Sequence, residues 1–172
     1  KVVERIILPN GSTDVKAVAK DAEGDYAYVT HLLSRYQLPT SQLDRGWMVT
    51  NALSIIDLRK KQLLTTVLLD TPQRGAANPW GVCVTPDNGE VVVAAAGSQE
   101  VVFIDREALH ARIARAQAGE KVTPSLDGWE NIPNDAGFLY GIRDFVSTKG
   151  KGVRSVVAVK DKIYATNYYT GQ

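Results

Sequence analysis

One stretch of the chain combines residue types that are suited to binding a ligand. His31 closes an apolar segment, and the residues that follow it include Arg35, Tyr36, Arg45 and Trp47. Imidazole is a frequent ligand in proteins, arginine forms charge-assisted hydrogen bonds with carboxylates, and aromatic rings supply large contact areas. We therefore predict that these residues bind a protein or a small-molecule ligand. The alternative interpretation gives His31 a structural hydrogen bond and lets Tyr36 and Trp47 pack the loop against the fold.

An acidic cluster surrounds Gly24. Asp21, Glu23 and Asp25 lie close together in the sequence and could supply oxygen ligands to a calcium ion. Their spacing is not that of an EF-hand loop, and a glycine between acidic residues is typical of a tight hairpin turn. We interpret the cluster as a turn between two strands, and we predict no metal site.

The other candidates are three basic residues, a histidine and the single cysteine. Lys149, Lys151 and Arg154 alternate with glycines and could hold an anion, although an exposed loop is the simpler interpretation. His110 lies among arginines in a predicted helix, so we expect it on a solvated face. Cys83 lies between two valines, which indicates a buried structural thiol, because a reactive thiol needs a partly exposed, electropositive setting.

No catalytic motif occurs in the sequence. The single cysteine excludes an internal disulfide, a paired-cysteine zinc site and a CxxCH haem attachment within these residues. We therefore predict no catalytic residue, no metal and no cofactor in this chain. The 20 basic and 19 acidic residues give a net charge of +1, and no basic stripe indicates nucleic-acid binding. No apolar run reaches the roughly 18 residues of a membrane-spanning helix.

The elements that must position these residues form a repeat. Residues 17–31, 82–96 and 156–167 each contain a short strand, a turn and a second strand, and two of them continue to a strand that ends in Asp57 or Asp105. The runs are rich in Val, Ile and Tyr, which favours strands. We expect residues 82–85 and 90–95 to be antiparallel neighbours.

A repeated meander of this length predicts the blades of a β-propeller. We predict an all-β fold, namely a partial β-propeller of four-stranded antiparallel blades with a helical and loop insertion. The segments before the repeats, at about 2–9, 62–70 and 145–152, are expected to supply the remaining strand of each blade. Residues 1–172 would then be part of one domain. Its units lie at about 1–70, 71–105 and 146–172, and its insertions at 32–50 and 106–145.

Within the second insertion, the sequence predicts one helix. Leu109, Ile113 and Ala116 share a helical face, and Gly119 is a suitable stop. The residues after this helix are predicted to form mostly loop, with a short helix near 138–145. About two and a half units fall short of the roughly four to eight blades of a closed propeller. We therefore expect the remaining blades to come from the parent chain or from another chain.

The repeat resembles the YVTN-type β-propeller repeat of bacterial secreted, periplasmic and surface proteins. The matching segments are a Pro-containing start at 78–81, a turn at 86–89 and a strand at 101–105, with Tyr-containing strands at 28–31 and 164–167. The resemblance implies a periplasmic or cell-surface location and a binding or scaffold role.

Two other functions are compatible with the same resemblance. Some proteins with this repeat carry a downstream di-haem module like that of cytochrome c peroxidase, so the chain could be the propeller portion of a larger redox protein. It could also belong to a lactonase-like propeller enzyme, in which acidic or histidine side chains converge near the propeller axis. The first alternative places its haem outside these residues, because no CxxCH motif is present. The second would be recognised by such side chains converging in the completed ring.

Overall fold

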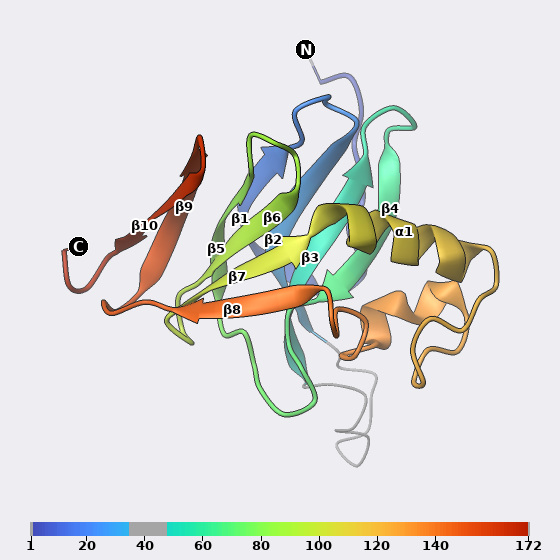
Figure 1. The fold of residues 1–172 in the computed structure, drawn as a ribbon. Helices are drawn as coiled ribbons and strands as arrows, with labels where there is room; N and C mark the ends of the chain where they lie inside the picture. Colours follow the sequence, from blue (N-terminus) through green and yellow to red (C-terminus); the bar gives the residue numbers. More distant parts are fainter. Residues whose placement is uncertain (1, 35–47, 172) are drawn as a thin grey trace.

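The computed structural model describes residues 2–34 and 48–171. Within these ranges, ten strands form three antiparallel sheets that stand next to one another (Figure 1). The first sheet has the strand order β1-β2-β3-β4. Its strands are β1 (Ser12–Lys20), β2 (Tyr26–Ser34), β3 (Val49–Asp57) and β4 (Gln62–Leu68).

The second sheet is also four-stranded, and the third is a hairpin. In chain order the strands are β5 (Pro79–Val84), β6 (Glu90–Ala95), β7 (Glu100–Asp105) and β8 (Arg143–Ser147), followed by β9 (Val153–Val159) and β10 (Lys162–Asn167). The predicted all-β class with four-stranded antiparallel sheets is therefore confirmed. The expected antiparallel neighbours are confirmed as well, because Val82 pairs with Val93 and Val84 with Val91.

The fourth strand of the two four-stranded sheets does not come from where the sequence predicted it. β4 pairs with β3 and completes the first sheet, and β8 pairs with β7 and completes the second. Residues 2–9 form no strand. The turn between β3 and β4 is short and places Lys61 at a φ of 56°, so β4 folds back directly onto β3. The helix expected near 138–145 is also wrong, since these residues form turns and the start of β8 at Arg143.

The first two sheets pack face to face over the main core. Tyr28, Leu53 and Ile55 from the first sheet meet Val93 and Ile104 from the second, and all five are 0 % exposed. β6 is buried on both faces, because its alternate residues Val92 and Ala94 pack against the third sheet. Burial on both faces explains why this strand reads as a continuous apolar run.

A helix closes one side of the core, as predicted. In α1 (Arg106–Gln117), Leu109, Ile113 and Ala116 are buried, and the Asp105 carboxylate caps the first turn by accepting from the Ala108 amide at 2.8 Å. Gly119, at a φ of 88°, follows the helix as expected. A 3-10 helix, η2 (Trp129–Asn134), packs between α1 and the end of the first sheet. Among the described helices, none is long and apolar enough to cross a lipid bilayer.

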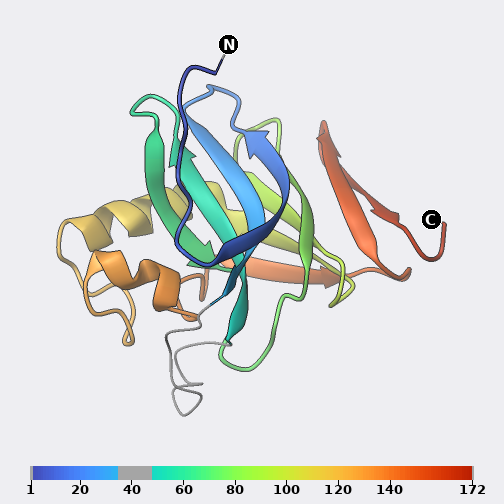
Figure 2. The ribbon, with the colours of Figure 1, turned by 180° about the vertical axis from the view of Figure 1, so that it is seen from behind.

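The first strands of the three sheets lie next to one another. β5 lies between β1 and β9 in Figure 1, and the same order is visible from behind in Figure 2. Gly81 makes the approach of β5 to β9 possible. A Cβ atom at this position would lie 2.9 Å from the carbonyl oxygen of Arg154 and 3.0 Å from the Cα of Ser155. Both are backbone atoms, so they cannot turn aside as a side chain would.

We expect the substitution Gly81→Ala to destabilise the fold by roughly 1–3 kcal/mol, because the added methyl group forces β5 and β9 apart. Urea unfolding followed by circular dichroism measures this loss. Gly75→Ala is the matched control, since its Cβ would meet only the Asp70 carboxylate at 3.5 Å, an ordinary contact. The control should change the free energy of unfolding by less than about 0.5 kcal/mol. Equal unfolding midpoints for the two variants would contradict the close packing of β5 on β9.

Candidate functional site

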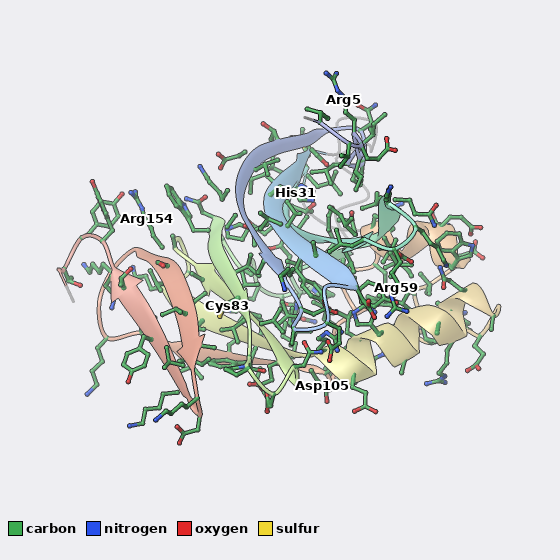
Figure 3. The ribbon with its side chains drawn as sticks, turned by 90° about the horizontal axis from the view of Figure 1, so that it is seen from above. Arg5, His31, Arg59, Cys83, Asp105 and Arg154 are labelled. Carbon is green, nitrogen blue, oxygen red and sulfur yellow. The ribbon has the colours of Figure 1, made fainter. Side chains whose placement is uncertain are left out.

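The structure describes one of the five residues predicted to bind a ligand. Arg35, Tyr36, Arg45 and Trp47 lie outside the described residues, so their role stays a prediction. His31 lies in β2, is labelled in Figure 3 and is 0 % exposed. A ligand therefore has no exposed surface of His31 to contact.

The hydrogen bonds of His31 correspond to the structural alternative. Its Nδ1 lies 2.9 Å from the Leu32 carbonyl oxygen, which can only accept, so Nδ1 carries the proton and donates. Nε2 then accepts from the Ser54 hydroxyl at 2.8 Å, and Ser54 Oγ lies 2.6 Å from Thr66 Oγ1. Burial lowers the pKa of His31, which keeps the ring neutral. The three side chains form an internal hydrogen-bond chain between β2, β3 and β4.

A cleft of about 780 Å³ lies where α1 meets the hairpin turns of the first two sheets. The labelled residues Arg59 and Asp105 mark this end of the molecule in Figure 3. Its wall combines aromatic and charged side chains, including Tyr26, Lys60, Asp87, Arg106, Glu107 and His110. It is the best candidate for a functional site among the described residues because it gathers titratable groups from three elements.

A network of four polar side chains supports this cleft. The Arg106 guanidinium donates from Nη2 to Asp21 Oδ2 at 2.6 Å and from Nε to Tyr28 Oη at 3.0 Å. Tyr28 Oη also lies 2.8 Å from Nε2 of His110. The His110 ring packs on Tyr26, with 4.2 Å between ring centroids. The network connects α1 to the first sheet.

The solvated face predicted for His110 is therefore wrong. Arg106 and His110 are four residues apart, so they share one face of α1, and that face is directed at Tyr26 and Tyr28 on β2. The helix sequence contains four arginine or histidine residues and gave no sign that a partner surface, some 80 residues earlier in the chain, would cover them.

The environment holds each member of the network in one protonation state at neutral pH. Burial, together with the charge of Arg106, lowers the pKa of His110 to about 4. Burial raises the pKa of Tyr28 to about 12. Burial alone would raise the pKa of Asp21, but hydrogen bonds from the Tyr26 amide and from Arg106 outweigh it and lower that pKa. The network thus contains a neutral phenol, a neutral imidazole and an ionised Asp–Arg pair.

These protonation states favour packing over acid–base catalysis. A general acid or base works best when its pKa is near the operating pH. The pKa values of about 4 for His110 and about 12 for Tyr28 lie far from neutrality on either side. Both groups are also engaged with each other, so neither offers a free donor or acceptor to a substrate.

The acidic turn belongs to the same contact between the sheets. Asp21 accepts from the amides of Asp25 at 2.8 Å and Tyr26 at 3.1 Å, which closes the hairpin turn as the sequence predicted. Glu23 accepts from the Asn88 side-chain amide, and Asn88 Oδ1 accepts from the Ala22 amide at 3.3 Å. Across residues 2–34 and 48–171, no group of three or more His, Cys, Asp or Glu side chains is placed to hold a metal ion.

Sequence reasoning missed Tyr28 and Arg106 as members of a site. The only local signal is the spacing of Arg106 and His110, which places two nitrogen-containing side chains on one helical face. Their partners are 78 and 82 residues away, as the Arg106–Tyr28 and Tyr28–His110 hydrogen bonds show. The pairing therefore depends on the tertiary structure.

The substitution Arg106→Met should destabilise the protein by about 3 kcal/mol, because it leaves the Asp21 carboxylate buried without its ion pair. The double variant Asp21→Asn/Arg106→Met should lose less than the sum of the two single losses. Urea unfolding of the wild type, Asp21→Asn, Arg106→Met and the double variant measures this coupling. Strictly additive losses would mean that Asp21 and Arg106 do not interact.

Acid should weaken the fold through His110. The unfolded chain takes up a proton below the ordinary histidine pKa of 6.5, whereas the folded protein takes it up only near pH 4. The stability from neutral His110 is thus present above pH 6.5 and is lost as the pH falls toward 4. Between pH 7 and pH 5, we expect the wild type to lose roughly 1–2 kcal/mol more than His110→Gln. Urea unfolding at a series of pH values tests this, and His31, present in both proteins, contributes equally to both. Parallel pH profiles would contradict the shifted pKa of His110.

Comparison with known proteins finds similar chains among curated proteins and among solved structures. No family model matches the chain. The chain is 23 % identical over 175 residues to the hydrazine synthase subunit beta of Kuenenia stuttgartiensis, a match that covers 99 % of this chain and 42 % of the relative. Among solved structures, the hydrazine synthase of the same organism matches with a TM-score of 0.76 and 22 % identity, covering 94 % of this chain and 44 % of that one. The chain spans less than half the length of either protein. At this identity the structural match establishes a shared fold.

Proposed function

We propose that this chain is part of a β-propeller that serves as a non-catalytic binding or scaffold module in a larger redox assembly. Its partners would be other protein chains or a small-molecule ligand, and the remaining blades would come from the parent chain or from another chain. A periplasmic or cell-surface location is part of the same proposal, and so is the kinship with YVTN-type repeats.

The open face of the third sheet is the observation that carries the proposal. β9 and β10 direct Val156 and Ile163 toward the second sheet. The opposite face carries Val157, Val159 and Tyr164, which are 51 %, 48 % and 54 % exposed. Apolar side chains gathered on one face of a sheet favour a packing partner. A neighbouring blade, stacked as the first sheet stacks on the second, would cover them.

The relatives support the redox part of the proposal. Hydrazine synthase is named as an enzyme, and the protein that matches over 99 % of this chain is named as its subunit beta. A similar subunit role for this chain agrees with the pKa values of His110 and Tyr28 in the cleft beside α1, which lie far from neutrality. Chemistry would then belong to other parts of the assembly.

Of the alternatives, no observation favours the lactonase-like enzyme. The lactonase hypothesis predicts that acidic or histidine side chains converge near the inner strands. In the part of the chain that the structure describes, His31 and His110 both engage in internal hydrogen bonds, away from any common site.

The chain studied alone should self-associate through the open face of the third sheet. Val157 and Tyr164 are direct partners across the hairpin, so the pair Val157→Glu/Tyr164→Lys places opposite charges side by side and preserves the hairpin. We expect this variant to sediment as a monomer at concentrations of tens of micromolar at which the wild type forms larger species, because charged residues prevent apolar packing.

Lys121→Glu, an exposed change outside the third sheet, is the matched control and should sediment like the wild type. A wild-type chain that stays a compact monomer at these concentrations would contradict the proposed packing role of the third sheet. Purification of the native protein tests the redox part, since we expect a haem absorption spectrum from the parent chain or from a chain that copurifies with it stoichiometrically. A native protein or assembly without haem or another redox cofactor would overturn it.

A further inference from the structure

We propose that Arg154 forms the centre of an oxyanion site that binds a carboxylate group. The site lies at the inner strands, away from the cleft beside α1, and the labelled Arg154 stands near the start of β9 in Figure 3. The inference does not depend on the propeller proposal, because it follows from the immediate surroundings of one side chain.

Aromatic rings surround the guanidinium. Its Cζ lies 4.3 Å from the ring centroid of Trp80, 3.9 Å from that of Tyr168 and 5.4 Å from that of Tyr169. Such cation–π contacts use the ring faces and leave the N–H groups available. A guanidinium has five N–H donors, and the structure gives one hydrogen bond, from Nη2 to Tyr169 Oη at 3.2 Å.

Two donors in this cluster have no partner. Nε of Arg154 and Nε1 of Trp80 are buried atoms without a hydrogen bond. Buried unpaired donors are rare in native proteins, and each calls for an explanation. A carboxylate has two oxygens and about four lone-pair positions, so one such group can accept several hydrogen bonds.

The local charge also calls for an anion. Lys16 stands over the same Trp80 ring, with its Nζ 4.4 Å from the centroid, but it already has an ion pair with Asp14. Within residues 2–34 and 48–171, no carboxylate lies within ion-pair distance of Arg154. The cluster therefore carries one positive charge that no described residue neutralises, and arginine pairs well with planar carboxylates.

The glycines of the preceding loop help to build the cluster. Gly152 adopts a φ of 71°, and a Cβ there would clash with the ring of Tyr169. Its carbonyl oxygen accepts from the Tyr168 amide at 2.9 Å, and that of Lys151 accepts from the Tyr169 amide at 3.1 Å. The alternation of basic residues and glycines, for which an exposed loop was the simpler interpretation, thus holds two tyrosines beside Arg154. Both tyrosines are mostly exposed, at 65 % and 69 %, so this side of the cluster faces solvent.

Titration calorimetry of the full chain tests the site with two carboxylate sources at constant ionic strength. The probes are succinate, as a small dicarboxylate, and a hexa-aspartate peptide, as an acidic protein segment. We expect saturable binding of at least one probe, weakened at least tenfold by Arg154→Gln and about threefold by Trp80→Phe, which keeps a ring but removes the Nε1 donor. Arg59→Gln, an exposed arginine elsewhere, should change the affinity less than twofold.

The pattern of results identifies the source or overturns the proposal. Tighter binding of succinate indicates a small-molecule carboxylate, and tighter binding of the peptide indicates an acidic segment of a partner chain. Arg154→Lys keeps the charge but loses the forked donor geometry, so it should also bind severalfold more weakly. Circular dichroism spectra of all variants confirm that each is folded. No saturable binding of either probe, or equal losses for Arg154→Gln and Arg59→Gln, would overturn the proposal.

Discussion

Each of the three described sheets has apolar side chains on both faces, and this constraint governs the rest of the structure. A sheet of that kind is stable only between two partners, because an uncovered apolar face remains in contact with water. The second sheet meets this requirement, since Val93 packs on the first sheet and Val92 on the third. The outer face of the third sheet does not, and its exposed Val157 and Tyr164 are the reason to expect a further partner.

Apolar packing alone leaves the sheets free to slide, and buried polar contacts fix their relative positions. Asp70 accepts from the amides of Asn51 and Ala76 at 2.8 Å, and Asn51 Oδ1 accepts from the amide of Asn78 at 2.8 Å. These bonds hold the connection between the first two sheets. The Asp21–Arg106 ion pair does the same for α1. Such directional bonds specify one arrangement among several that would bury similar apolar area.

The polar side chains singled out here fall into two groups, those whose hydrogen-bonding groups have partners inside the protein and those with unpaired donors. The chain through His31 and the network through His110 are internally paired, and their pKa values keep them in one protonation state near neutral pH. Arg154 and Trp80 retain unpaired donors. Paired networks are suited to holding a structure together, whereas unpaired donors beside an unneutralised charge are suited to recognition. This division agrees with a protein that binds and organises partners.

The sequence by itself determined the hairpins of the repeats and the helix with its buried face of Leu109, Ile113 and Ala116, because these depend on local periodicity and turn chemistry. It offered two roles for His31, and burial in β2 decided for the structural one. Only the tertiary structure decided which sheet each fourth strand joins, what covers His110 and what surrounds Arg154. These contacts join segments far apart in the chain, and the identity of a residue does not reveal which distant surface will face it. Pairing of β4 with β3 is the clearest case, since the sequence predicted β4 in the second blade and the short turn folds it back onto β3.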